Sequence, residues 1–169
     1  VIPDDIIEEF GADALRLYEM FMGPLEKEKI WNTEGVQGCK RFLNRFYEMV
    51  ISDKACDDDD DEVSLKLAHR LAASVAKDTE AMHFNTAIAK MMEFVNEMIK
   101  LPKYCRRALR MAVQALSSYG PHIAEELWQH LGAETSVVES LYPEIEEKYL
   151  VDDMVTYIIQ VNGKLRGRF

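Results

Sequence analysis

The sequence lacks the features that mark membrane and secreted proteins. It contains no run of about 18 apolar residues, so no membrane-spanning segment is predicted. The N-terminus, Val-Ile-Pro-Asp-Asp, is not a basic region followed by an apolar one, which argues against a secretory signal. The three cysteines, Cys39, Cys56 and Cys105, form no Cys-x-x-Cys pair. Their odd number and wide spacing favour a reducing, cytoplasmic compartment.

Motifs of catalysis are also scarce. There is no Gly-rich phosphate loop, no Gly-x-Ser-x-Gly and no convincing catalytic triad. Glu80-x-x-His83 is half of a di-iron motif whose second copy is missing, and the alternative reading is an exposed helix end. His122-x-x-Glu125-Glu126 lacks the second histidine of a zinc protease motif and is typical of a first helical turn. We therefore expect no catalytic residue, metal site or cofactor site within this chain.

Basic residues are fewer than acidic ones, and the excess of acids is unevenly distributed along the chain. The 169 residues hold 30 acids and 20 Lys or Arg, for a net charge of −10, which taken as a whole disfavours a nucleic-acid partner. Residues 1–62 hold 17 acids and 7 bases, whereas residues 63–169 hold 13 of each. Six acids stand together in residues 57–62. Such a run is either a solvated loop or a first helical turn with acids at its positive end.

Apolar spacing predicts a mainly α protein, a bundle of five to seven helices. The predicted helices cover about 3–10, 13–22, 33–51, 62–82, 85–101, 103–119 and 121–131, with Gly11 ending the first and Thr33 capping the third. Their large apolar residues are assigned to the core rather than to a ligand site: Phe42, Phe46, Met91, Met92 and Met98.

The sequence pattern changes after about residue 136. Residues 155–161 are rich in β-branched and aromatic side chains, Asn162-Gly163 is a strong hairpin turn, and a returning strand follows. A lone hairpin is marginal in water, so we expect this C-terminal β-hairpin to come from a truncated α+β domain. The chain starts with Val and stops within a strand, so we expect a piece of a larger protein.

Three basic clusters lie in stretches without acids. Residues 35–47 hold Lys40, Arg41, Asn44 and Arg45 at helical i, i+4 spacing. Residues 98–124 hold Lys103, Arg106, Arg107 and Arg110, of which the first and the last two are predicted to share a helix face. Lys164, Arg166 and Arg168 alternate along the last strand. Each cluster is either a solvated face or a site of phosphate contact.

Several segments of the sequence resemble a known family of enzymes. Residues 3–16, PDDIIEEFGADALR, resemble the segment that follows the lysine-rich signature loop of class I aminoacyl-tRNA synthetases. Residues 17–26, LYEMFMGPLE, followed by Trp31, Gly35, Gly38 and the RFLNR of residues 41–45, resemble bacterial-type leucyl-tRNA synthetase in particular. FNTAIA at 84–89, PHIAEELW at 121–128 and VNGK at 161–164 match the same family in the expected order. The resemblance covers nearly the whole chain, although the acidic run at 57–62 departs from the family's pattern.

The resemblance implies a domain layout. Residues 1–33 resemble the stem-contact or connecting region, residues 34–135 the helical anticodon-binding domain, and residues 136–169 a linker and the start of a truncated C-terminal domain. It implies a cytoplasmic, monomeric parent enzyme that uses ATP and Mg²⁺ to join leucine to tRNA(Leu). The nucleotide site, the leucine pocket and the editing domain would lie outside this chain, so the chain alone is expected to be inactive.

The resemblance and the basic clusters together predict how tRNA is held. Leucine has several anticodons, so reading anticodon bases gains little, and we expect backbone contacts that position the tRNA. The predicted contacts are Lys40, Arg41, Asn44 and Arg45, followed by Arg106, Arg107 and Arg110. Trp31 either stacks on a base or packs in the protein, and Arg16 is expected to tie neighbouring segments together. The alternative function is an acidic helical scaffold that binds protein partners through exposed Met-rich or aromatic faces.

Overall fold

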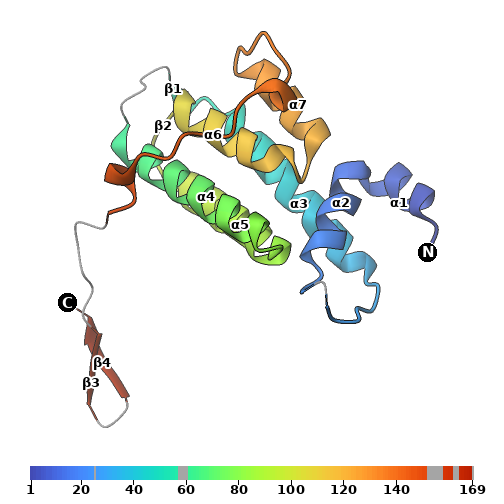
Figure 1. Ribbon diagram of the computed structural model, residues 1–169, viewed down its shortest axis with the longest axis horizontal. Helices are drawn as coiled ribbons and strands as arrows, with labels where there is room; N and C mark the ends of the chain where they lie inside the picture. The colour runs from blue at the N-terminus through green and yellow to red at the C-terminus, as the bar shows by residue number, and fades with distance from the viewer. Residues whose placement is uncertain (25, 57–60, 152–157, 162–163, 169) are drawn as a thin grey trace.

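The computed structural model describes residues 1–24, 26–56, 61–151, 158–161 and 164–168, the last two ranges as backbone only. The described residues form seven α-helices in the order α1(Pro3–Phe10), α2(Ala12–Phe21), α3(Thr33–Val50), α4(Glu62–Glu80), α5(Phe84–Met98), α6(Arg106–Ser117) and α7(Pro121–His130) (Figure 1). They also form the short strands β1(Ala55–Cys56) and β2(Tyr104–Cys105), the 3-10 turns Val137–Glu139 and Glu147–Tyr149, and the strands β3(Ile158–Val161) and β4(Lys164–Arg168). The predicted mainly α bundle is confirmed.

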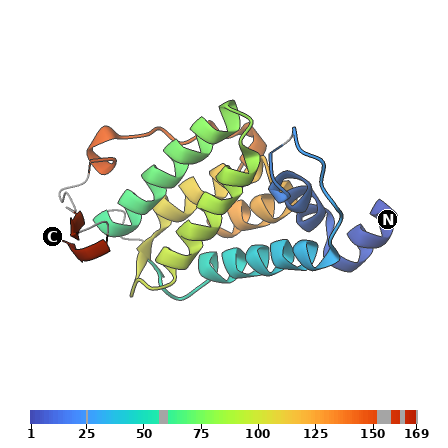
Figure 2. The same ribbon diagram turned by 90° about the horizontal axis from the view of Figure 1, so that it is seen from below.

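The helices pack as two connected groups around one core. α4 lies against α5 and α6, α3 lies against α2 and α5, and α7 joins the groups through α6 and α3 (Figures 1 and 2). The predicted core residues fit this arrangement, because Phe42, Phe46, Met91 and Met98 are buried and Met92 packs at the edge of the core. The apolar helix faces predicted from the sequence are therefore the ones that meet in the interior.

The N-terminal helices share this core. Leu17 and Tyr18 of α2 are buried in the same cluster as Val36 and Leu43 of α3. The Tyr18 hydroxyl also accepts a hydrogen bond from the Asn32 backbone N–H at 2.7 Å. The boundaries at residues 33 and 135 stay predictions, and the packing continues across the first of them.

Two helix starts differ from the prediction. Asn32, not Thr33, caps α3, because its side chain accepts the Glu34 N–H at 2.9 Å. α6 begins at Arg106 rather than Lys103, because Tyr104 and Cys105 form β2, which pairs in parallel with β1. The Cys105 sulfur then accepts the Ala108 N–H and caps α6. Strands of two residues carry no periodic signal, which is why the sequence pattern did not reveal this pair.

The C-terminal hairpin is present as predicted at the level of the backbone. β3 and β4 are antiparallel, with Val161 opposite Lys164 and an irregularity between Ile159 and Gln160. The predicted turn at 162–163 and the strand residues 155–157 lie outside the described residues. Residues 57–60 of the acidic run do too, but Asp61 caps α4 by accepting the Ser64 N–H, and Glu62 is the first helical residue. The assignment of the hairpin to a truncated α+β domain stays a prediction.

Two other features are absent from the described residues. No helix among them is long and apolar enough to cross a membrane. Within the same residues, no three His, Cys, Asp or Glu side chains come together in a way that could hold a metal ion.

Candidate nucleic-acid interface

The exposed face of α3 carries one of the predicted basic clusters. Arg41, Asn44 and Arg45 are all exposed, while Phe42, Leu43 and Phe46 between them point into the core. The i, i+3 and i, i+4 spacing places the exposed side chains on one side of the helix. We call Arg41, Asn44 and Arg45 the α3 face.

The α3 face is continued by α5. The guanidinium of Arg45 donates a hydrogen bond to the amide oxygen of Asn96 on α5 at 2.8 Å. A guanidinium has five N–H donors, so this bond leaves donors for a ligand. The contact directs Arg45 toward α5 and leaves Arg41 over the middle of α3.

Lys40 has a different setting from its neighbours. Its ammonium donates to the backbone oxygen of Glu9 at 2.9 Å and lies 5.9 Å from the centre of the Phe10 ring. Glu9 is in the last turn of α1, where backbone oxygens lack partners and a positive charge is favourable. Lys40 therefore joins α3 to the end of α1, a role that its sequence spacing did not reveal.

A groove of about 360 Å³ borders the α3 face where it meets α7. Lys40, Leu43 and Asn44 line it from α3, residues 10–14 from the junction of α1 and α2, and His122 and Ile123 from α7. The Asp13 carboxylate accepts the Ile123 N–H at 2.8 Å and contacts Nδ1 of His122 at 2.8 Å. Asp13 thus caps α7 from another helix.

Asp13 and His122 were missed as a pair in the sequence analysis. A weak signal existed, because Gly120 precedes Pro121, the first residue of α7, and no Ser, Thr, Asp or Asn stands there to cap the helix. Its free N–H groups must then find a partner elsewhere in the fold. The sequence could indicate that need, but not that Asp13 meets it.

The predicted cluster on α6 does not form a common face. Lys103 precedes the helix, Arg107 pairs with Glu146, and Arg110 donates to the backbone oxygen of Leu131 at 2.7 Å. Arg106, half-buried, begins α6. The expectation of a shared face for Lys103, Arg107 and Arg110 is therefore wrong, because the chain at 103–105 is extended.

The Arg107 pair belongs to a small ionic network. Hydrogen bonds from Lys148 and Arg107 lower the pKa of Glu146 to about 2. The pairing with Glu146 in turn raises the pKa values of Arg107 and Lys148. At neutral pH the positive charge of Arg107 is thus accompanied by a carboxylate. Within the part of the chain that the structure describes, Arg41 has no such partner.

Trp31 and Arg16 make contacts within the protein. The Trp31 ring packs edge-on against Tyr18, with 5.0 Å between centroids, and its Nε1–H donates to the Thr33 hydroxyl at 3.1 Å. The side chain remains partly exposed. Arg16 donates to the backbone oxygen of Ser118 at 3.2 Å, as expected for a residue that ties segments together. The side chains of Lys164, Arg166 and Arg168 lie outside the described part of the chain.

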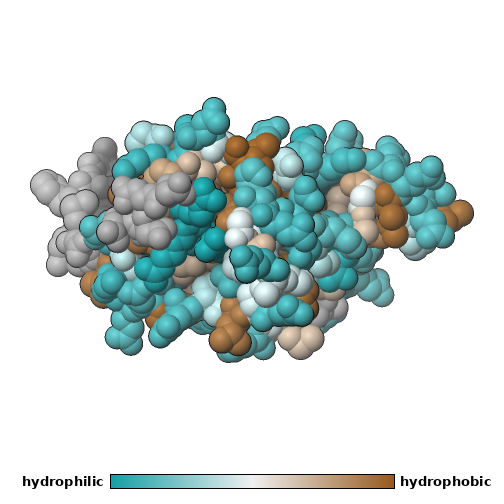
Figure 3. Space-filling view, turned by 90° about the horizontal axis from the view of Figure 1, so that it is seen from above, coloured by the Kyte–Doolittle hydropathy of each residue, from teal (hydrophilic) through white to brown (hydrophobic). Residues whose placement is uncertain are grey.

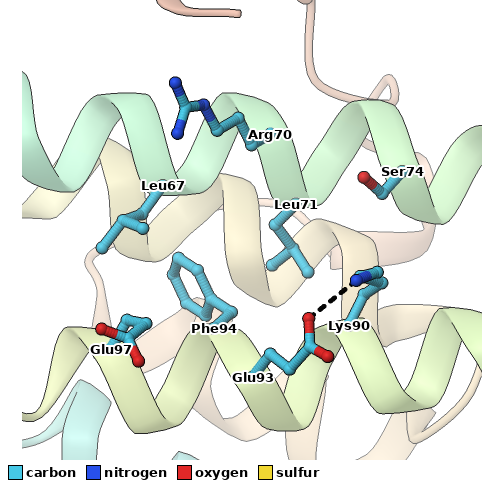
Figure 4. A pocket seen from close by; sticks show the side chains of 8 residues that line it. All are labelled: Leu67, Arg70, Leu71, Ser74, Lys90, Glu93, Phe94 and Glu97. Atoms are coloured by element: carbon cyan, nitrogen blue, oxygen red, sulfur yellow. Dashed lines mark hydrogen bonds and ion pairs between the residues drawn. The ribbon is translucent and has the colours of Figure 1, made fainter. Parts of the chain in front are cut away.

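Other surfaces offer less for a polyanion. Figure 3 shows a face on which hydrophilic residues predominate and hydrophobic ones form separate patches. The groove between α4 and α5 has an apolar floor of Leu67, Leu71 and Phe94 (Figure 4). At its rim Lys90 is 2.8 Å from Glu93, so the local charge is balanced. The α3 face remains the best candidate for phosphate contact.

Comparison with known proteins identifies the family to which the chain is similar. The family model described as the anticodon-binding domain of tRNA ligase matches residues 61–169. The chain is 60% identical over 167 residues to the leucine–tRNA ligase of Protochlamydia amoebophila and 53% identical over 168 residues to that of Chlamydia caviae. Each match covers 99% of this chain and 20% of the relative. The chain thus spans about a fifth of the length of the curated relatives it matches.

A solved structure matches over the full chain. It is the crystal structure of a ternary LeuRS–tRNA–LeuAMS complex from Agrobacterium radiobacter, with a TM-score of 0.81 and 27% sequence identity. The match covers 100% of this chain and 24% of that one.

Proposed function

The chain belongs to the family of anticodon-binding domains of tRNA ligases, and from this we propose that it is the part of a leucine–tRNA ligase that grips and positions tRNA(Leu). The complete enzyme would activate leucine with ATP and Mg²⁺ and transfer it to the tRNA, at sites in the remaining length of the protein. This chain would hold the tRNA so that its acceptor end reaches that distant site. Positioning of this kind contributes to rate by converting an encounter into an oriented complex.

The observation that carries the proposal is the α3 face. Arg41, Asn44 and Arg45 are exposed on one side of a helix whose residues 35–47 contain no acid. A guanidinium suits phosphate because its planar donors match two oxygens at once. Contacts with phosphates fix the register of a nucleic acid without reading its sequence. This suits an enzyme that must accept several anticodons.

The other residues predicted to contact tRNA support the proposal less directly. Lys40 supports the α3 face by fixing α3 to α1. Arg106, Arg107 and Arg110 contribute positive charge on α6, and the last two do so while bonded to Glu146 and Leu131. Trp31 has its indole N–H and one ring edge engaged within the protein, which favours packing over base stacking.

The test is charge reversal on the α3 face of the intact ligase. We expect Arg41→Glu with Arg45→Glu to weaken tRNA binding at least about tenfold, because hydrogen bonds to charged groups are worth about 1.5–3 kcal/mol each. The slope of log affinity against log salt should fall by about one for each lost phosphate contact. Binding is measured by titrating labelled tRNA(Leu) at several salt concentrations.

The control makes the same change of charge elsewhere. Lys77→Glu with Lys90→Glu makes the same change in net charge on α4 and α5, at residues that do not belong to the α3 face. We expect the control to retain the affinity and salt slope of the parent within about twofold, because charges beyond the Debye length are screened. Equal losses in both double variants would mean that only net charge matters and would refute the assignment of α3.

A further inference from the structure

The imidazole of His122 is exposed and yet held in place. Its side chain is 75% exposed, and Nδ1 lies 2.8 Å from Oδ1 of Asp13. The Asp13 side chain is only 10% exposed and also accepts the backbone N–H groups of His122, at 3.4 Å, and Ile123, at 2.8 Å. An exposed ring of this kind would ordinarily rotate freely, but here the buried carboxylate fixes its orientation.

The contact with Asp13 also fixes which nitrogen carries the proton. An ionised carboxylate can only accept hydrogen bonds, so the Nδ1 of His122 must donate. In the neutral imidazole the other nitrogen, Nε2, is then an acceptor. No hydrogen bond to Nε2 is made within the part of the chain that the structure describes. In its neutral form His122 therefore presents an oriented acceptor on an exposed ring.

That acceptor lies beside the proposed tRNA surface. His122 lines the groove of about 360 Å³ between α3 and α7, and Asn44 of the α3 face lines the same groove. Asn44 is exposed and carries both a donor and an acceptor on its amide. A strand of RNA that contacts Arg41 can thus reach His122 by way of Asn44.

The charges around the groove indicate which part of the RNA backbone fits. Asp13 lies at its base, and the adjoining α1 carries Asp4, Asp5, Glu8 and Glu9. Among the described residues that line the groove, Lys40 supplies the ammonium, which is bonded to the Glu9 backbone oxygen. A phosphate in the groove would be repelled by these acids, whereas a ribose hydroxyl is neutral and would not be repelled. The 2′-hydroxyl is also the donor that the backbone of RNA has and that of DNA lacks.

We propose that His122 and Asn44 form a ribose-binding contact in which Nε2 of His122 accepts a hydrogen bond from a 2′-hydroxyl of the bound tRNA. The proposal rests on the proposed function of the α3 face and extends its contact surface to α7. Asp13 acts as a positioning residue, because it holds the imidazole without touching the RNA.

The first test replaces His122 in the intact ligase. We expect His122→Ala to raise the KM for tRNA about three- to tenfold, the usual worth of one neutral hydrogen bond. The kcat for aminoacylation and leucine-dependent ATP–pyrophosphate exchange should stay unchanged. The matched control is His130→Ala, which removes an exposed histidine at the other end of α7. An unchanged KM in His122→Ala, or an equal rise in His130→Ala, would overturn the proposal.

Two further substitutions distinguish a hydroxyl from a phosphate. Gln supplies an acceptor oxygen, so His122→Gln should retain most of the affinity. Lys supplies only donors and a positive charge, so His122→Lys should bind as weakly as His122→Ala. If His122→Lys instead binds more tightly and steepens the salt dependence, the ligand at this position is a phosphate and the assignment to ribose is wrong.

A double-mutant cycle identifies the partner on the RNA. Single 2′-deoxy substitutions are scanned through the tRNA, and each is measured with the parent ligase and with His122→Ala. One position should cost the parent about three- to tenfold and the variant almost nothing. If every position is additive with His122→Ala, no 2′-hydroxyl meets this residue. The Arg41→Glu, Arg45→Glu variant distinguishes the proposed tRNA-binding function from the ribose contact of His122. If only the ribose contact is wrong, this variant should still bind tRNA weakly.

Discussion

Gly35 shows how tightly a single position on α3 is constrained. A Cβ at this residue would lie 2.4 Å from Cε2 of Tyr18, well inside van der Waals contact. Tyr18 cannot easily yield, because its hydroxyl bonds the Asn32 N–H and its ring packs against Trp31. We expect Gly35→Ala to lower the free energy of unfolding by about 1–3 kcal/mol, as overpacking does. Urea denaturation of the chain followed by circular dichroism measures this change.

Gly38 on the same helix is the matched control. Apart from the adjoining helix backbone, the nearest described atom to a Cβ there would be in the Arg41 guanidinium at 3.9 Å, which is ordinary contact. Gly38→Ala should therefore stabilise the chain by about 0.5–1 kcal/mol, because alanine is the better helix former. Stabilisation by both substitutions would show that Tyr18 moves aside at little cost.

Sequence alone predicted the residues on the α3 face better than their partners. The helical spacing predicted that Arg41 and Arg45 share a face and that Lys40 and Asn44 form the adjoining row, and Arg41, Asn44 and Arg45 are exposed. Their contact with tRNA stays a prediction. The spacing could not predict that Lys40 bonds Glu9 or that Arg110 bonds Leu131. Those contacts depend on how distant helices meet, and spacing along one helix carries no information about that.

Among the helices, α7 depends most clearly on a residue from elsewhere. Asp13 of α2 supplies the cap that the sequence around Gly120-Pro121 lacks. We expect Asp13→Ala to destabilise the chain by about 1–3 kcal/mol, because it leaves N–H groups of α7 without an acceptor. Asp13→Asn keeps one acceptor oxygen and should cost less. Asp5→Ala, an exposed acid in the first turn of α1, is the control and should cost least.

Residues 136–150 follow α7 and run back over the bundle to α4 (Figure 1). Ser136 and Val137 bond the Glu125 carboxylate, the Tyr142 hydroxyl donates to Ala72 O at 2.9 Å, and the Glu146 N–H donates to Nδ1 of His69 at 3.2 Å. His69 is fully buried and stacks on Tyr149. This segment is thus fastened at several points, one of which can titrate.

The bond to His69 makes stability depend on pH. Burial lowers the pKa of His69 in spite of the attraction of Glu146, and the bond from Glu146 N–H requires an unprotonated Nδ1. As pH falls below about 6.5, the unfolded chain binds a proton that the folded chain resists, so stability is lost. Unfolding measured from pH 7.5 to 5 should show this loss.

His69→Gln tests the cause of that pH dependence. The Gln amide oxygen can still accept the Glu146 N–H but does not titrate. We expect a flatter stability profile between pH 7.5 and 5 in this variant. Glu146 stabilises the folded chain throughout this pH range, because its pKa is about 2 in the folded chain and about 4.3 in the unfolded one. That stabilisation is lost only as pH falls below about 4.3. Identical stability profiles for the parent and His69→Gln would rule out His69 as the cause of the pH dependence.

At the scale of the whole molecule, sequence sufficed for the family and fold class. The predicted resemblance to leucyl-tRNA synthetases is confirmed by relatives 53–60% identical over 99% of the chain. Periodicity predicted the helices, because each one buries a regular apolar face. It missed the β1–β2 pair, which joins residues 49 positions apart, such as Ala55 and Tyr104. Pairing over that distance is decided by how α3, α4 and α6 pack.

The net charge of −10 would suggest that the chain binds tRNA poorly. For binding, however, the arrangement of charge on the surface matters more than its sum. Four of the acids are residues 57–60, part of the run of six that ends at Glu62, whereas residues 35–47 contain no acid.

If charge on the α3 face governs binding, the four aspartates at 57–60 should have little influence on tRNA affinity. Replacing all four by Asn in the intact ligase makes the net charge of this chain less negative by four, but should change tRNA affinity less than about twofold at 0.15 M salt. The reversal of Arg41 and Arg45 changes charge by the same amount in the opposite sense and should have a far larger effect. If neutralising the aspartates strengthens binding as much as reversing the arginines weakens it, tRNA responds to total charge. Binding would then be governed by the whole molecule rather than by one helix.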